Sequence, residues 1–185
     1  TMSGNIDRIL ASYFLDATVV MSYFLAYEIF TKYWLIAYIM NPIIFVRYAD
    51  SQKSIRNIYI LLKIFSLISI IAICGLLFFV WYLPDFFTSV FNISLDNSYI
   101  VIFFSAIAIN ATTQIMVTIL TAKGYGKNLV VINTVITIVM GIFSLFAILK
   151  FGVNGLIVAW LIKSIFEGIW IGSLFMREEK NEVYA

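Results

Sequence analysis

Ionisable side chains interrupt several of the apolar stretches of this sequence. They form four groups: Asp7 with Arg8, Glu28 with Lys32, Lys63, and Lys163 with Glu167. A lone charge at the centre of a lipid bilayer costs at least about 2.5 kcal/mol, so such residues usually face a helix interface or a water-filled cavity. In two of the groups the acid and the base are four residues apart, which places them on one helix face where their charges can neutralise each other. These groups predict either structural contacts between helices or a shared polar cavity.

Polar and small residues form stripes along three of the apolar stretches. The first stripe consists of Asn110, Thr113, Gln114, Thr118 and Thr121, which fall within an arc of about 140° on a helix. The second consists of Asn133, Thr137, Gly141 and Ser144, and the third of Trp160, Lys163, Ser164 and Glu167. Because helices in lipid pack through small and polar residues, we expect the second stripe to be a packing surface, whereas the large amide of the first favours a cavity lining. The third combines a flat aromatic ring with polar groups, which suits a sugar and almost equally an interhelical contact.

The sequence lacks the residues that most catalytic sites use. It has no histidine, the commonest general base and metal ligand, and its single cysteine, Cys74, lies in an apolar run where it would resist becoming a thiolate. We recognise no nucleophile with a neighbouring base and no cluster of metal ligands in the sequence. We therefore expect neither an enzyme nor a bound metal or cofactor, and we expect no nucleic-acid partner.

The composition requires lipid as the surrounding medium. Of the 185 residues, 63% are hydrophobic and only 12% are charged, so the chain cannot supply the polar surface that a soluble domain of this size needs. Five stretches reach the roughly 20 apolar residues that a membrane-spanning helix requires; they are 19–45, 58–83, 99–121, 129–149 and 153–175. Lipid leaves the backbone no other hydrogen-bond partner, so all five should be helices. The predicted fold class is an all-α, polytopic transmembrane helix bundle with five full spans.

Turn and capping residues separate the predicted helices. Pro84 ends one helix, Asp96 or Ser98 can cap the next, and Gly152 with Gly155 makes the last turn tight.

A sixth apolar stretch, 2–15, is shorter than a span. Its 14 residues reach about 21 Å at a rise of about 1.5 Å each, whereas the hydrocarbon core is about 30 Å thick. We expect it to be a truncated N-terminal span, the far part of a longer helix, in a chain that is a fragment of a larger protein. Asp7 and Arg8 would then lie near the middle of the membrane.

Basic residues sort to one side of the predicted bundle. If the helices simply alternate, one side carries Arg47, Lys53, Arg56, Lys63, Lys123, Lys127, Arg177 and Lys180, whereas the other carries Asp16, Asp85 and Asp96 with Lys150 as its single basic residue. Because Lys and Arg near helix ends stay in the cytoplasm, we expect the basic side to be cytoplasmic. The chain then divides into a transmembrane bundle over 1–176 and a cytoplasmic tail over 177–185.

Several motifs resemble those of the polysaccharide and O-antigen flippases, in the superfamily of multidrug, oligosaccharidyl-lipid and polysaccharide exporters. The first is NIDRILASYFLDATVVMSYFLAYEIFTKYW, in which an Asp inside a helix is followed by an Asp-Ala turn and by a helix that contains Tyr. The others are NP at Asn41 and Pro42, AKGYGKN before a helix rich in Asn and Thr, and FGVNGLIVAW at the start of the last span. The similarity covers nearly the whole chain and is to the C-terminal six-helix lobe of a twelve-span transporter.

The resemblance implies that the protein flips an undecaprenyl-pyrophosphate-linked oligosaccharide, an O-antigen or capsule repeat unit, across the bacterial inner membrane by alternating access. It implies membrane lipid, a missing N-terminal lobe and the polysaccharide polymerase machinery as partners. Cationic side chains in a cavity can replace the water around a pyrophosphate with charge-assisted hydrogen bonds. The candidate substrate-binding residues are Arg8, Lys32, Lys163, Gln114, Asn110 and Trp160. The candidate charge-pairing or proton-coupling residues are Asp7, Glu28 and Glu167.

Two alternatives remain open at this point. A multidrug or other small-molecule exporter of the same superfamily would share the fold. A non-transporting membrane subunit of a glycan-synthesis complex would instead place the charged pairs against other helices, with no cavity between them.

Overall fold

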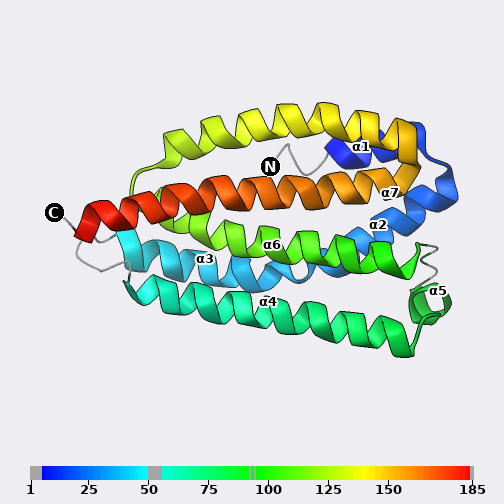
Figure 1. The fold of residues 1–185 in the computed structure, drawn as a ribbon, viewed down its shortest axis with the longest axis horizontal. Coiled ribbons are helices and arrows are strands. Elements are labelled where there is room, and N and C mark those ends of the chain that lie inside the picture. The colour runs from blue at the N-terminus through cyan, green and yellow to red at the C-terminus, as the bar shows by residue number, and fades with distance from the viewer. Residues whose placement is uncertain (1–5, 50–55, 92, 94, 184–185) are drawn as a thin grey trace.

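The structure, a computed structural model, describes residues 6–49, 56–91, 93 and 95–183. Within these residues the regular secondary structure is entirely helical, which confirms the all-α prediction. The helices are α1 (Ile6–Phe14), α2 (Ala17–Thr31), α3 (Trp34–Ala49), α4 (Arg56–Tyr82), α5 (Phe86–Phe91), α6 (Asn97–Ala122) and α7 (Gly126–Val183). The long helices lie lengthwise beside one another, and the turns gather at the two ends of the bundle (Figure 1).

Three helical segments are long and apolar enough to cross a membrane: Leu62–Tyr82, Asn97–Ala122 and Gly126–Arg177. A fourth is obtained if α2 and α3, which meet at a bend of 40°, are counted as one span. These segments indicate a membrane protein, but the five full spans predicted from the sequence are not confirmed. The difference arises at two breaks, because the predicted helix 19–45 is divided and the predicted helices 129–149 and 153–175 are joined.

The joined pair forms α7, which reverses its direction at Gly152. This residue has φ of 62° and ψ of −143°, a left-handed conformation that glycine adopts without a steric penalty. A side chain is also excluded at Gly155, where a Cβ atom would lie 2.2 Å from the carbonyl oxygen of Ala147. The tight turn predicted for these two glycines is therefore confirmed. We call residues 126–151 the first arm of α7 and residues 153–183 the second arm; they lie side by side (Figure 1).

The divided pair breaks after Thr31, where the sequence contains neither Pro nor Gly. The Thr31 hydroxyl donates to the carbonyl oxygens of Tyr27 and Glu28, at 2.7 and 3.3 Å. The Lys32 amide, which in a regular helix would bond the Glu28 carbonyl, donates to the Ile29 carbonyl at 3.3 Å. Competition of this kind from a Thr hydroxyl bends helices. The single helix predicted over 19–45 is therefore wrong, because the backbone leaves the regular helical hydrogen-bond pattern at Lys32.

The remaining helix ends agree in part with the predictions. α4 ends at Tyr82, two residues before Pro84, as predicted. Asp96 occupies the N-cap position of α6, but its side chain forms no capping hydrogen bond. α7 continues to Val183, beyond the predicted boundary at residue 176 between bundle and tail.

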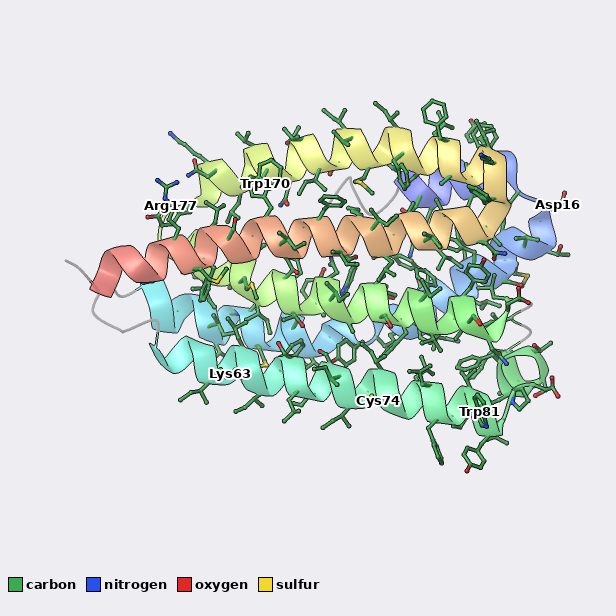
Figure 2. All side chains as sticks on the ribbon, in the orientation of Figure 1. Asp16, Lys63, Cys74, Trp81, Trp170 and Arg177 are labelled. Carbon is green, nitrogen blue, oxygen red and sulfur yellow. The ribbon has the colours of Figure 1, made fainter. Side chains whose placement is uncertain are left out.

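The two ends of the bundle carry different kinds of side chain. Lys63 and Arg177 lie toward one end, whereas Asp16 and Trp81 lie toward the other (Figure 2). Lys53 and the side chains of Arg47, Arg56 and Lys180 fall outside the part of the chain that the structure describes. We call the two ends the basic end and the acidic end.

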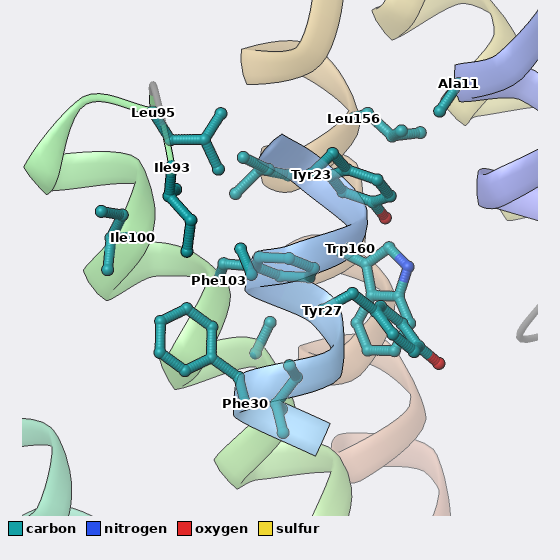
Figure 3. Packing of buried hydrophobic residues seen from close by; sticks show 14 of the residues in the cluster. Ala11, Tyr23, Tyr27, Phe30, Ile93, Leu95, Ile100, Phe103, Leu156 and Trp160 are labelled. Carbon is teal, nitrogen blue, oxygen red and sulfur yellow. The ribbon is translucent and has the colours of Figure 1, made fainter. Parts of the chain in front are cut away.

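Aromatic rings from α2, α6 and the second arm of α7 form the centre of the core. The rings of Tyr23 and Phe103 are stacked with their centroids 5.2 Å apart, and Tyr27 meets Trp160 edge to face at 5.9 Å. Figure 3 shows the hydroxyl of Tyr23 and the indole nitrogen of Trp160 on the same side of this cluster. A well-packed aromatic core therefore presents two polar atoms in one direction.

Candidate functional site

Asp7 of α1 accepts hydrogen bonds from both of these polar atoms. The Tyr23 hydroxyl donates to Oδ2 of Asp7 at 2.6 Å, and the Trp160 indole nitrogen donates to the same oxygen at 2.9 Å. The carboxyl is buried, with 4% of the residue exposed. Hydrogen bonds to an ionised carboxylate are stronger than those between neutral groups. Asp7 therefore ties α1 to α2 and to the second arm of α7.

The other oxygen of this carboxyl, Oδ1, is buried and has no hydrogen-bond partner among the described residues. A cavity of about 20 Å³ lies beside Asp7, between α1 and the two arms of α7. A cavity of this volume accommodates about one water molecule. Its polar lining comes from Asp7, Thr137, Ser144 and Lys163. The acid thus lies next to a small polar space rather than in a wholly apolar one.

Lys163 lies at this cavity and not against the acid predicted to pair with it. Its ammonium group is 5.5 Å from the centroid of the Trp160 ring, a cation–π distance. Within the described residues Lys163 and Glu167 form no ion pair at 4.0 Å or less. Glu167 is buried and accepts a hydrogen bond from Nδ2 of Asn110 in α6 at 3.0 Å. The predicted pair is therefore not in direct contact, because an amide from another helix is the closer partner, although the charge of Lys163 still acts on Glu167.

The second predicted pair is present and extends to a third residue. Glu28 contacts Arg8 through Oε1 at 3.2 Å and Lys32 through Oε2 at 3.7 Å. The Arg8 guanidinium also lies 4.0 Å from the centroid of the Tyr27 ring. One carboxylate thus joins a cation of α1 to a cation at the end of α2. We call Arg8, Glu28 and Lys32 the charge ladder.

The charge ladder is open to the surroundings of the chain. The exposed fractions of the side chains are 33% for Arg8, 58% for Glu28 and 68% for Lys32. Arg8 and Lys32 are 8 and 16 residues from Asp16 at the acidic end, so a rise of about 1.5 Å per residue places them at most about 12 and 24 Å from that end. Lys32 also lies at the break between α2 and α3, near the middle of the segment Ala17–Ala49, so the charge ladder lies away from both ends of the bundle.

The first two polar stripes of the sequence both contribute to contacts between helices, the first through Asn110 and the second through Gly141, which faces Ile6 of α1. Asn110 of the first stripe donates its hydrogen bond to Glu167, and Gln114 is half-buried. The threonine hydroxyls of this stripe donate to carbonyl oxygens of their own helix, as in the 3.0 Å bond from Thr113 to Ile109. The second stripe, expected to be a packing surface, contributes Thr137, Gly141 and Ser144 to the cavity beside Asp7.

Sequence reasoning missed two functional contacts. Tyr23 was not singled out, and Trp160 was considered for a sugar rather than for Asp7. The signal that could have found them is an acid in an apolar stretch, because a buried carboxylate requires donors and Tyr and Trp carry a donor on a largely apolar ring.

The described part of the chain has no group of three or more Cys, Asp or Glu residues arranged to hold a metal ion.

Comparisons with protein-family models, with curated proteins and with solved structures found no match to the chain. The function of the protein must therefore be inferred from the geometry of the site.

Proposed function

We propose that the chain is one lobe of a transporter that flips a lipid-linked oligosaccharide across the bacterial inner membrane. The observation that supports this proposal is the charge ladder, three ionisable side chains that are exposed at mid-depth on an apolar bundle. Exposed charges at this depth are unfavourable against lipid tails. A water-filled passage between this bundle and a second lobe removes that cost.

The chemistry of the charge ladder suits a pyrophosphate group. Arg8 offers a planar, permanently charged donor, and Lys32 offers a compact ammonium group. Glu28 holds both cations through its two carboxylate oxygens, as two oxygens of a phosphate would. We propose that the substrate pyrophosphate replaces Glu28 between the two cations and that Glu28 returns when the substrate leaves. Lys163, at the cavity beside Asp7, would bind a further phosphate oxygen or a sugar hydroxyl.

The proposal includes a membrane topology. Because the two arms of α7 run in opposite directions, each would cross the membrane once. With α2 and α3 as one bent span, α4 and α6, this makes five full spans, and α1 would complete a truncated sixth. The basic end would then face the cytoplasm together with the C-terminus. Binding at mid-depth between two lobes is the arrangement that alternating access requires.

The first test asks whether the charge ladder faces water. In a Cys74→Ser background, Lys32→Cys and Ile71→Cys place single thiols at positions of similar exposure, 68% for the Lys32 side chain and 62% for Ile71 on the outer face of α4. A charged thiol reagent modifies only a thiolate in water. In membranes that contain the complete transporter, we expect Lys32→Cys to react at least tenfold faster, about 1.4 kcal/mol of difference in barrier. Equally slow modification of both positions would place the charge ladder against lipid and contradict the proposal.

The second test measures export in cells that depend on the complete transporter for surface polysaccharide. We expect Arg8→Ala, Lys32→Ala and Lys163→Ala each to reduce the polymer at the cell surface strongly while protein levels are unchanged. Lys150→Ala is the matched control, because within the described residues the Lys150 ammonium forms no ion pair, lies 5.4 Å from the ring of its neighbour Phe151 and is next to the turn at Gly152. Normal polymer in all three variants would rule out the cations as the substrate site.

A further inference from the structure

A groove runs between α4, α6 and the second arm of α7 in the half of the bundle nearer the basic end. Its volume of about 500 Å³ is within the range of known ligand sites. Its lining is apolar except for Lys63 and Ser66, both on α4. The groove is separate from the charge ladder, which lies on α1 and α2.

Gly172 of α7 keeps the floor of this groove open. A Cβ atom at this position would have no other atom within 4 Å, so the space above the glycine belongs to the groove and not to a neighbouring side chain. Leu67 of α4 and Met116 of α6 line the groove on the other helices. An unbranched hydrocarbon chain could therefore approach the backbone of α7 closely.

Lys63 places a positive charge at the edge of this apolar surface. The side chain is exposed, and no acid or hydrogen-bond acceptor contacts its ammonium group within the described residues. Lys63 is seven residues from the start of α4 at Arg56, about 10 Å of helical rise, so its long stem can carry the charge to the membrane surface. Ser66, three residues further, lies on the same face and adds a hydroxyl donor.

We propose that this groove binds an anionic phospholipid of the leaflet at the basic end. One acyl chain lies in the groove over Gly172, the phosphate is paired with the Lys63 ammonium, and Ser66 donates to a phosphate or ester oxygen. A hydrocarbon tail complements the apolar lining, and a single negative headgroup complements the single cation. The inference does not depend on the proposed transport function, because none of its residues belongs to the charge ladder.

The experiment is native mass spectrometry of the full chain in detergent micelles, titrated with phosphatidylglycerol and with phosphatidylcholine of the same acyl chains. We expect wild-type protein to retain one phosphatidylglycerol molecule in preference to phosphatidylcholine. Lys63→Gln should reduce retention of phosphatidylglycerol about fivefold and leave that of phosphatidylcholine unchanged. Gly172→Leu, which fills the groove while Lys63 remains, should reduce retention of both lipids. Lys150→Gln at the acidic end is the matched control and should retain phosphatidylglycerol as the wild type does.

Three results would overturn the proposal. Unchanged retention of phosphatidylglycerol by Lys63→Gln would show that the charge does not recognise the headgroup, and unchanged retention by Gly172→Leu would show that the groove does not hold the tail. The third result comes from a parallel titration with undecaprenyl phosphate: wild-type protein that retains this lipid in place of phosphatidylglycerol would assign the groove to the carrier lipid instead. Neither substitution removes a contact of the core, so both variants should fold.

Discussion

Asp7 and Arg8 are neighbours in sequence but have opposite environments. Successive residues of a helix point about 100° apart, so α1 directs Asp7 into the aromatic core and Arg8 toward the outer face of α2. The carboxyl of Asp7 is held by two donors from other helices, whereas Arg8 is one-third exposed and pairs with the carboxylate of Glu28, which is more exposed still. One short helix thus carries a buried anchor and a partly exposed cation side by side.

The strongest test of the anchor is Trp160→Ala. The indole donates to Asp7 and contacts the rings of Tyr27, Trp34 and Phe103, so its removal creates a cavity and leaves the buried acid with one donor. We expect the free energy of unfolding in detergent to fall by about 3–5 kcal/mol. Trp81→Ala, at an indole that is 85% exposed, is the control and should change it by less than about 0.5 kcal/mol. Equal effects at the two positions would mean that the core around Asp7 is not packed as described.

Substitution of Asp7 itself should lower the free energy of unfolding by less than Trp160→Ala does. Asp7→Ala leaves the Tyr23 hydroxyl and the Trp160 indole N–H without an acceptor, at a cost of about 1–3 kcal/mol in the free energy of unfolding. Asp7→Asn keeps one oxygen in place and should lose less than half of that. The measurement is again unfolding in detergent, and an Asn variant as unstable as the Ala variant would argue against the two hydrogen bonds.

Arg8→Lys keeps the charge of the ladder but removes the planar group that lies over the Tyr27 ring. The expected loss is about 0.5–1 kcal/mol of stability. Circular dichroism of thermal unfolding, compared with that of Lys150→Arg, would measure it. A Lys variant more stable than the wild type would show that the stacking contributes nothing.

Glu28→Gln should have the smallest effect on stability of these variants. It therefore separates a structural role of the charge ladder from a role in transport. Its carboxylate is 58% exposed, and ion pairs this exposed contribute about 0–1 kcal/mol. Under the proposed function, however, the same change should reduce export strongly, because the two cations lose the group that replaces the leaving pyrophosphate. Surface polysaccharide and thermal stability should be measured on the same variant. A variant that loses stability and export in proportion would indicate a structural role instead.

The sequence was most informative where local chemistry decides the structure. The apolar stretches predicted the helices, Gly152 and Gly155 marked the reversal within α7, and the i,i+4 spacing of Glu28 and Lys32 predicted a contact that is present at 3.7 Å. Each of these depends on residues within one turn of one another. Local patterns of this kind can be read without knowledge of the tertiary fold.

The contacts of the site depend on residues distant in sequence and could not be predicted in the same way. Trp160 is 153 residues from Asp7, and Glu167 is 57 residues from Asn110. Spacing alone therefore assigned Glu167 to Lys163 on its own helix. The break after Thr31 escaped prediction for a different reason, because neither Pro nor Gly marks it and the apolar pattern continues through it.

The reversal at Gly152 has a mechanical consequence for any motion of the bundle. Because a single non-helical residue joins the two arms and their backbones touch beside Gly155, neither arm can slide or tilt far without the other. The two arms of α7 should move as one rigid body. Bending would instead concentrate at Leu15 and Asp16 and at the hydroxyl-capped break after Thr31, the two joints on either side of the segment that carries Glu28. A rocking movement would thus alter the spacing of the cations while the hairpin keeps its shape.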